Sequence, residues 1–192
     1  MAYVELLDLK TYLGVTEDDD DALLVSLIDR AQAIFDGQTN RTFEATADTT
    51  RRFDATADVD GATLLLDRDL CSITTITNGD STTIASTKYV TEPRNGTPYY
   101  AIRLLGSSGL SWSAASNGDH ENAISILGKW AYSTTAPADV VEAIVNIATL
   151  LYRFKDNAND YSRTVVTATS TILPGGLSPT TLATIRRYKR LL

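Results

Sequence analysis

The chain has one cysteine, Cys71, and one histidine, His120, among its 192 residues. One cysteine excludes an intramolecular disulfide, and a zinc site of Cys/His ligands cannot be assembled from a single residue of each type. A Cys–His catalytic pair is formally possible, but a small residue at the start of a strand is the simpler interpretation of Cys71. The scarcity of both residue types therefore favours neither a disulfide framework nor a zinc centre.

The chain also lacks a long apolar run and an excess of positive charge. No stretch approaches the roughly 20 apolar residues that a bilayer-spanning helix requires, and the opening "MAYVELLDLK" has no basic region of a secretory signal. The formal net charge is −7, whereas binding to phosphates of nucleic acids needs a basic surface. We therefore expect a soluble protein with no membrane contact and no general affinity for nucleic acid.

Motifs that carry chemistry are missing too. There is no phosphate-binding GxxxxGK(S/T) sequence, and no GxGxxG opens a helix. The "GSSG" at 106–109 lacks the strand–turn–helix context of a nucleophile elbow. Many carboxylates occur, but they lie at expected helix starts and turns, where capping and solubility account for them. The sequence accordingly predicts no enzyme, with no catalytic, cofactor-binding or metal-binding residues.

What the chain does have is an acidic run directly before an apolar helix. In "VTEDDDDALLVSLIDRAQAIFDG", Asp18 is the expected N-cap, and Asp19, Asp20 and Asp21 fill the first turn, where the helix dipole favours negative charge. Gly37 is expected to end this helix. A calcium loop of the EF-hand type would alternate its ligands and have a glycine at its sixth position, and this run does neither. The helix start is thus the favoured interpretation.

Two further helices are expected in the same part of the fold. A short one begins at Leu9, with Asp8 as its cap and Gly14 as its end. A long one covers 137–154, with Pro137 in its first turn. Its apolar surface is broad enough to be buried on two sides, against the preceding helix and against another subunit. The residues expected in that core or subunit interface include Val141, Ile144, Ala148 and Leu151.

Between these helices, residues 42–135 are rich in Thr, Val, Ile and Tyr in short runs, which indicates about six or seven strands. The clearest hairpin is "SITTITNGDSTTIAS", in which Asn78 and Gly79 are expected to supply the positive φ angles of a tight turn. Residues 106–122 form a Gly/Ser/Asn-rich loop, long enough to suggest a partner-facing element. Trp112 in this loop is either an interface anchor or a packed side chain.

Charge is unevenly distributed along the chain. Residues 1–60 hold fourteen Asp/Glu and five Lys/Arg, whereas the last sixteen residues have four basic residues and no acid. A basic helix is expected from Ser178-Pro179 onward. Its end could touch nucleic acid, bind an acidic protein surface, or be a solvated helix end that the dipole favours. The residues concerned are Arg186, Arg187, Tyr188, Lys189 and Arg190.

These patterns predict an α+β fold. Its small helical core combines the N-terminal helix pair with the long helix near 137–154, and it carries a β-rich insertion and a C-terminal basic helix. We expect a single domain over 1–176, made of a helical core at 1–43 and 136–156 with the insertion at 44–135. Residues 177–192 are expected to form a separate docking tail.

Two segments resemble the head–tail connector proteins of tailed phages, also called adaptor or head-completion proteins. The first is "LLDLKTYLGVTEDDDDALLVSLIDRAQAIFDGQTNRTF" at 6–43, with its Leu-Lys-x-Tyr-Leu helix, acidic cap and Arg-x-Phe. The second is "ISILGKWAYSTTAPADVVEAIVNIATLLYRF" at 124–154. The hairpin "KYVTEPRNGTPYYAIRLL" between them is similar as well. Together these segments cover about half of the chain.

The resemblance implies a structural virion protein of the phage neck, assembled in the host cytoplasm. Such proteins form a ring, usually of twelve copies, between the portal protein and the stopper or tail-completion protein, and extend the DNA channel without binding DNA specifically. A soluble monomer before assembly is compatible with this role. It also implies a DNA-repelling surface at Asp18–Asp21, portal docking by residues 186–190 in a tail ordered only when the partner is present, and stopper or tail contact through Asn78, Gly79 and Trp112.

Three alternatives remain open at this stage. Another neck or tail component, such as a stopper or tail terminator, would be mostly β and would lack the helix pair at the start. A β-rich carbohydrate-binding module would need exposed aromatic side chains on the β block. An enzyme is the weakest alternative, because no group of residues supports one.

Overall fold

The computed structural model describes residues 3–156 and 176–190 of the chain. The chain divides into two compact units: a helical unit, which takes residues 1–41 and 136–192, and a β unit, Thr42–Thr135. Helices and antiparallel strands both contribute, so the predicted α+β fold class is confirmed. No helix in the described ranges is both long and apolar enough to cross a membrane.

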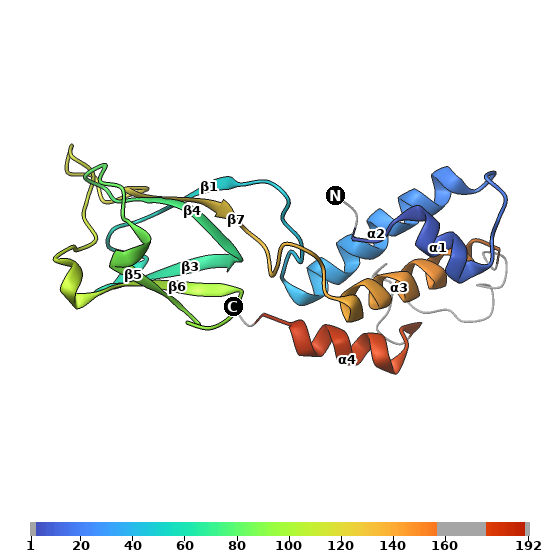
Figure 1. The fold of residues 1–192 in the computed structure, drawn as a ribbon. Helices are drawn as coiled ribbons and strands as arrows, with labels where there is room; N and C mark the ends of the chain where they lie inside the picture. Colours follow the sequence, from blue (N-terminus) through green and yellow to red (C-terminus); the bar gives the residue numbers. More distant parts are fainter. Residues whose placement is uncertain (1–2, 157–175, 191–192) are drawn as a thin grey trace, which may run out of the picture. The chain divides into compact units, whose positions relative to one another are not determined.

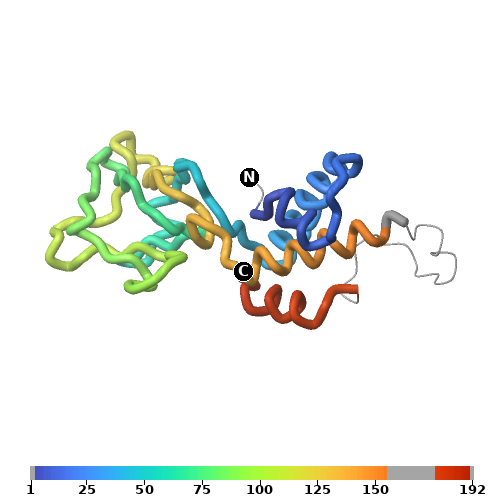
Figure 2. Tube along the Cα trace, turned by 45° about the vertical axis from the view of Figure 1, so that its right-hand side comes forward, coloured from blue at the N-terminus to red at the C-terminus, as the bar shows by residue number. Residues whose placement is uncertain are grey.

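The helical unit is built around two long helices that pack along each other, α2 and α3. The short helices α1 and α4 each contact both of them (Figure 1). In Figure 2 the red helix α4 again runs beside the orange helix α3. The four helices span Leu6–Leu13 (α1), Asp21–Thr39 (α2), Ala138–Asp156 (α3) and Pro179–Tyr188 (α4).

The core of the helical unit comes from the apolar stripes that the sequence pattern predicts. On α2 the stripe includes Leu24, Ile28 and Phe35, and on α3 it includes Val140 and Ile144; all five side chains are at most 2% exposed. Residues three and four positions apart share one helix face, so each stripe presents a continuous apolar surface to the other helix. Burial of these stripes is what holds the two helices together.

The ends of the first two helices differ from the sequence-based expectations. The N-cap of α1 is Glu5 rather than Asp8, although Gly14 ends the helix as expected, with φ of 71°. The N-cap of α2 is Asp20 rather than Asp18, since the Asp18 carboxylate binds Lys10 instead of the helix start.

The end of α2 also lies beyond its predicted position. Gly37 is inside the helix, which continues to Thr39 and ends where Asn40 takes the left-handed conformation with φ of 53°. A glycine inside a helix costs only about 1 kcal/mol relative to alanine, so buried contacts further along can carry the helix past it. Thr39 is such a residue: it is fully buried, and its hydroxyl donates to the Phe35 carbonyl at 2.8 Å.

The β unit contains seven strands in two antiparallel sheets. One sheet has the order β1-β7-β4 and the other has the order β2-β3-β6-β5. The strands span Thr49–Phe53 (β1), Val59–Asp60 (β2), Thr63–Leu70 (β3), Ser72–Thr77 (β4), Tyr89–Glu92 (β5), Tyr99–Leu104 (β6) and Ile124–Lys129 (β7). β3 and β4 belong to different sheets and are separated only by Cys71, so the chain passes from one sheet to the other there.

Both sheets contribute to one apolar core. Its largest members include Phe53 and Ile126 from the first sheet and Leu64 and Ile102 from the second. Trp112, from the 106–122 loop, belongs to the same cluster. The alternation of buried and less buried residues along β7, Ile124–Lys129, is the period-two pattern of a strand with one face on the core.

The hairpin predicted around Asn78 forms only in part. β4 pairs mainly with β7, and the expected second strand is reduced to a bridge between Thr77 and Thr83. Two backbone hydrogen bonds flank this bridge, from Asn78 to the Thr82 carbonyl and from Ile84 to the Ile76 carbonyl. Ser81 adopts a positive φ of 66°, which interrupts the extended backbone that a longer ladder requires. A short 3-10 helix, Ser86–Lys88, then leads into β5.

Candidate functional site

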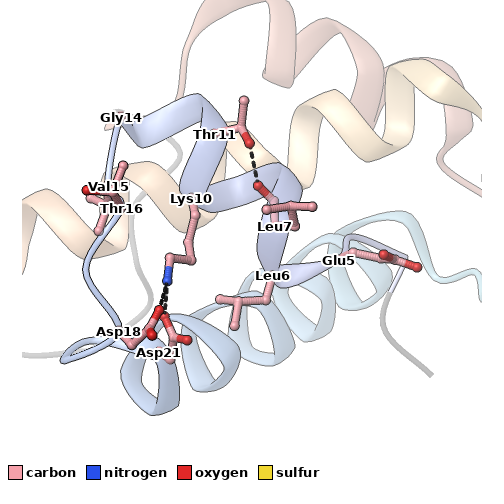
Figure 3. A pocket seen from close by; sticks show the side chains of 10 residues that line it. All are labelled: Glu5, Leu6, Leu7, Lys10, Thr11, Gly14, Val15, Thr16, Asp18 and Asp21. Carbon is pink, nitrogen blue, oxygen red and sulfur yellow. Dashed lines mark hydrogen bonds and ion pairs between the residues drawn. The ribbon is translucent and has the colours of Figure 1, made fainter.

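The acidic start of α2 is held by a lysine from α1. Lys10 Nζ lies 2.7 Å from Asp18 Oδ1 and 2.7 Å from Asp21 Oδ1 (Figure 3). The hydrogen bond to Asp18 is the main reason that the pKa of Lys10 is raised, and the same bond is the main reason that the pKa of Asp18 is lowered. Lys10 therefore ties α1 to the beginning of α2.

The four aspartates at this point have different surroundings. Asp20 accepts a hydrogen bond of 2.6 Å from the Tyr152 hydroxyl on α3, and Asp21 binds Lys10. The Asp18 side chain is 88% exposed despite its contact with Lys10, and Asp19 is exposed as well. A DNA-repelling role for this run stays a prediction, and Asp18 and Asp19 are the members with carboxylates on the surface.

A hollow of about 780 Å³ lies beside this ion pair. Leu6 and Leu7 on α1 and Val15 in the connection to α2 provide its apolar lining, and Glu5, Asp18 and Asp21 provide acidic groups (Figure 3). Leu7 is 70% exposed, a large fraction for a leucine. The hollow thus combines an apolar surface with a negatively charged rim.

The predicted interface residues of α3 lie mainly inside the helical unit. Ile144 and Ala148 are fully buried and Leu151 is 7% exposed, whereas Val141 is only partly buried. Of the two roles that the sequence leaves open for this set, packing in the core is the one visible in the structure. A contact with another subunit stays a prediction for Val141.

The predicted docking residues end the last described helix, α4. Ser178 caps this helix by accepting from the Thr181 backbone N–H at 3.1 Å, and Thr181, Ile185 and Tyr188 are buried. Proline in the first turn also favours the helix start. The segment was expected to be ordered only when a partner is present; here it is already helical and packed against α2 and α3.

Asp139, in the first turn of α3, holds the end of α4. Its Oδ1 accepts from the Tyr188 hydroxyl at 2.9 Å, and its Oδ2 accepts from Arg187 Nη1 at 3.2 Å. From the end of α2, Arg41 Nε donates to the Tyr188 carbonyl at 2.7 Å. Arg186 and Lys189 remain exposed. We refer to these contacts of Asp139 and Arg41 with the end of α4 as the α4 clasp.

The residues predicted for stopper or tail contact come together inside the β unit. Asn78 Nδ2 donates to the Ser111 carbonyl at 2.9 Å, and Trp112 Nε1 donates to the Ala62 carbonyl at 2.9 Å. A Cβ atom on Gly79 would overlap the Ser113 carbonyl oxygen. The 106–122 loop is thus packed onto the turn at Asn78–Gly79. Because Trp112 is 8% exposed, it is a core residue here, and its contact with a partner stays a prediction.

The described residues offer little for catalysis. Cys71 is buried, its Sγ donates to the Lys129 carbonyl at 3.3 Å, and burial raises the pKa of its thiol. A nucleophilic cysteine shows the opposite shift. Within residues 3–156 and 176–190, no group of three His, Cys, Asp or Glu side chains is placed to hold a metal ion.

Sequence reasoning missed two residues that matter to these surfaces, Lys10 and Asp139. A signal was available for Lys10, because it is the only Lys or Arg among the first 29 residues, which contain eight Asp/Glu. A lone cation among so many acids is expected to pair with some of them. For Asp139 the sequence offers no such signal, since its partners are 48 and 49 positions away.

Comparison with known proteins gives one family and two structures of particular interest. Residues 3–70 match the sequence model of the phage gp6-like head–tail connector protein family. The fold is similar to a chain in the neck of an empty gene transfer agent particle computed with C6 symmetry, with a TM-score of 0.58 and 17% identity over 97% of this chain and 90% of that one. It is also similar to a chain in the virion of a native gene transfer agent particle, with a TM-score of 0.55 and 19% identity over the same shares.

A search of curated proteins gives no match. The family match covers α1, α2 and the chain as far as the end of β3. This region contains the helix pair and the Arg-x-Phe sequence that carry the resemblance. At identities below 20%, the two structural likenesses show a shared fold. The resemblance of this chain to the phage head–tail connector family is thereby confirmed.

Proposed function

We propose that the protein is a structural component of a virion neck, where copies of it form a ring between the portal and the stopper or tail. The observation that carries the proposal is the match of residues 3–70 to the head–tail connector family. The likeness of almost the whole chain to a chain from a particle neck supports it further. In this role the protein joins head to tail and extends the channel through which DNA passes.

The charge of the chain suits a DNA conduit. Basic surfaces bind DNA because they neutralise phosphates and release the counterions around them. This chain has a net charge of −7 and exposes Asp18 and Asp19, so it lacks that source of affinity. A channel wall should let DNA slide rather than hold it. The acidic start of α2 is the candidate for a surface that faces the channel.

For the portal contact, we propose the exposed face at the end of α4. Arg186 and Arg187 project from the helix there, and the Arg187 side chain is 73% exposed although it binds Asp139. Guanidinium groups in this position are suited to carboxylates on a partner. Tyr188 is buried, so its role in docking is to hold the helix rather than to touch the portal.

The alternatives fit the described structure less well. A stopper or tail terminator would be mostly β, whereas α1 and α2 occupy much of the first forty residues. A carbohydrate-binding module needs a flat row of exposed aromatic rings. In the β unit Trp112 is buried, and Trp130 packs against Phe53 and Arg51. Among the described residues of this unit, Tyr100 is the one aromatic residue in the group of exposed large apolar side chains.

Loss of the gene product tests the proposed role. Particles made without it should accumulate as DNA-filled heads and separate tails in negative-stain electron microscopy, and expression of the wild-type chain from a plasmid should restore joined particles. Heads that still join tails in its absence would rule the proposal out.

The portal contact has its own test. Arg186→Glu should reduce the amount of this protein that a purified portal protein retains, because it reverses one exposed charge. The matched control is Arg68→Glu, which changes an exposed arginine in the β unit by the same charge. Equal retention of both variants would exclude Arg186 from the contact. Truncation of 177–192 should abolish retention.

A further inference from the structure

The acid-rimmed hollow beside α1 has the features of a docking site for a basic, apolar segment. Leu6, Leu7 and Val15 offer apolar surface, and the 70% exposure of Leu7 leaves that surface open to solvent. The lining has three carboxylates, from Glu5, Asp18 and Asp21, and one cation, Lys10, which binds Asp18 and Asp21. The excess of negative charge favours a positively charged occupant.

A segment with matching chemistry exists in the same chain. Lys189 and Arg190 are followed by Leu191 and Leu192, so two cations precede two large apolar residues. α4 ends at Tyr188, and Lys189 has an extended backbone with φ of −60° and ψ of 121°, so the chain leaves the helix there. The basic residues complement the carboxylates, and the leucines complement the apolar lining.

The hollow and this segment lie at opposite ends of α2. The hollow contains Asp21, the first residue of α2, whereas the Arg190 backbone N–H donates to the carbonyl of Thr39, the last residue of α2, at 2.8 Å. A helix of 19 residues is about 28 Å long at about 1.5 Å per residue. Two further residues span about 7 Å at most. Leu191 and Leu192 therefore cannot reach the end of the hollow formed by Asp18 and Asp21 of their own chain while this contact holds.

We propose that Leu191 and Leu192 of one copy bind in the acid-rimmed hollow of a second copy, with Lys189 and Arg190 facing its carboxylates. Unlike surfaces at the two ends of one helix produce a head-to-tail contact, which closes into a ring when the rotation per subunit permits. Only the closure into a ring rests on the proposed function. The contact between two copies is argued from the geometry and charges of the helical unit. It leaves Arg186 and Arg187, on α4 itself, available for the portal.

Disulfide trapping between two single-cysteine chains tests the contact. One chain carries Leu7→Cys and the other carries Leu192→Cys, both in a Cys71→Ser background, so that every disulfide formed between them joins two copies. The purified chains are mixed at high concentration, oxidised and analysed by mass spectrometry for the link between positions 7 and 192. The control replaces the first chain with Ala33→Cys, an exposed position on α2 outside the hollow.

The 7–192 link should form at least about tenfold faster than the 33–192 link, because binding raises the effective concentration of the two thiols. Equal rates for the two pairs would overturn the proposal. Circular dichroism of each variant establishes that the fold is retained, and Leu7 and Ala33 are both exposed positions at which cysteine leaves no cavity.

Charge exchange distinguishes this contact from accidental proximity. Glu5→Lys in the Leu7→Cys chain should slow the link to a normal Leu192→Cys chain, and Lys189→Glu in the Leu192→Cys chain should slow the link to a normal Leu7→Cys chain. Combining the two altered chains should restore the rate, since the charges are complementary again. Failure of the combination to recover would contradict the assigned pairing.

Failure of this inference is separable from failure of the proposed function. If heads and tails require the protein but the 7–192 link does not exceed the control, the function stands and the interface is wrong. If Leu7→Cys in assembled particles links instead to the portal protein, the occupant of the hollow is the portal, and the proposed contact between copies is excluded.

Discussion

At the residue scale, Asp36 on α2 is the carboxylate with the most strongly perturbed pKa among the described residues. Its Oδ2 accepts a hydrogen bond of 2.9 Å from the Tyr3 hydroxyl, while Oδ1 is buried and accepts none within the described part of the chain. Burial raises the pKa of Asp36 from 3.8 to about 6, and the bond from Tyr3 opposes that rise. Because the pKa of this carboxyl group is higher in the folded state than in the unfolded state, the free energy of unfolding depends on pH.

The direction of this dependence follows from the raised pKa. Because the folded state binds the proton more tightly than the unfolded state, stability should fall as the pH rises from about 4 to about 6 and then become level. Asp36→Asn should flatten this part of the curve and unfold at a higher temperature than the wild type at pH 8. Thermal unfolding followed by circular dichroism measures both; Asp29→Asn, an exposed aspartate on the same helix, is the control. A slope that persists in Asp36→Asn would show that another group causes it.

A second prediction at this scale concerns Gly79, at the turn that the 106–122 loop covers. A Cβ atom here would overlap the Ser113 carbonyl oxygen and lie 2.5 Å from the Ala114 carbonyl carbon. Both are backbone atoms, which cannot rotate away, so Gly79→Ala should destabilise the β unit by about 1–3 kcal/mol. Gly96→Ala is the control, because a Cβ atom at Gly96 would meet nothing within 4 Å. Equal urea midpoints for the two variants would show that the loop does not pack on the turn.

The sequence reached these residues unevenly. Asn78 and Gly79 mark a turn in the sequence, but neither has the positive φ that the predicted tight turn requires. The positive φ is at Ser81, whose N–H donates to the Asn78 carbonyl at 2.9 Å. Trp112 is ambiguous from sequence, since a tryptophan in a polar loop can anchor a partner or fold back on its own core. In the structure it folds back on its own core and donates a hydrogen bond to the Ala62 carbonyl, 50 positions away. Such distant pairings leave no trace in a single sequence.

At the element scale, the α4 clasp fixes a helix that would be marginal alone. α4 has 10 residues, fewer than the roughly 12–15 at which isolated helices begin to persist in water. Its order therefore depends on the buried side chains Ile185 and Tyr188 and on the contacts with Asp139. Periodicity and the Ser178-Pro179 start predict the helix; its partner on α3 is a tertiary contact that periodicity does not reveal.

Removing the carboxylate at Asp139 tests the clasp. Asp139→Ala removes the acceptor for both Arg187 and Tyr188. A typical hydrogen bond contributes about 0.5–1.5 kcal/mol to stability, so local opening of α4 should become easier and its amides should exchange several-fold faster. Hydrogen–deuterium exchange with mass spectrometry measures this locally. Glu142→Ala, an exposed change on the same helix, should leave α4 unaffected. Unchanged exchange in Asp139→Ala would mean that the apolar contacts alone hold α4.

The helix boundaries show where element-level prediction stops. The stripes of α2 and α3 are predicted well, since amphipathic periodicity persists over many residues. The ends of the helices are predicted less well. Asp18 is the residue type and position expected for an N-cap, but its carboxylate binds Lys10. Gly37 is expected to end α2, but the helix continues to the buried Thr39. In both cases a tertiary contact competes with a local preference and prevails.

At the scale of the whole molecule, the sequence indicates the α+β class and the β-rich insertion because each segment has a consistent period. The pairing of the strands into two sheets, β1-β7-β4 and β2-β3-β6-β5, is not accessible in this way, since it joins segments far apart in the chain. The chain has two units, the helical unit and the β unit, Thr42–Thr135. Because each unit has its own core, each can carry its own binding surface: the end of α4 on the helical unit and the 106–122 loop on the β unit.

The place of this chain in a particle can be observed directly. The decisive measurement is a cryo-electron microscopy reconstruction of the neck of the particles that encode it. We predict a ring of this chain, recognisable by the helices α1–α4, between the portal and the stopper or tail. A complete neck reconstruction in which other chains account for all density between portal and tail would contradict the proposed role.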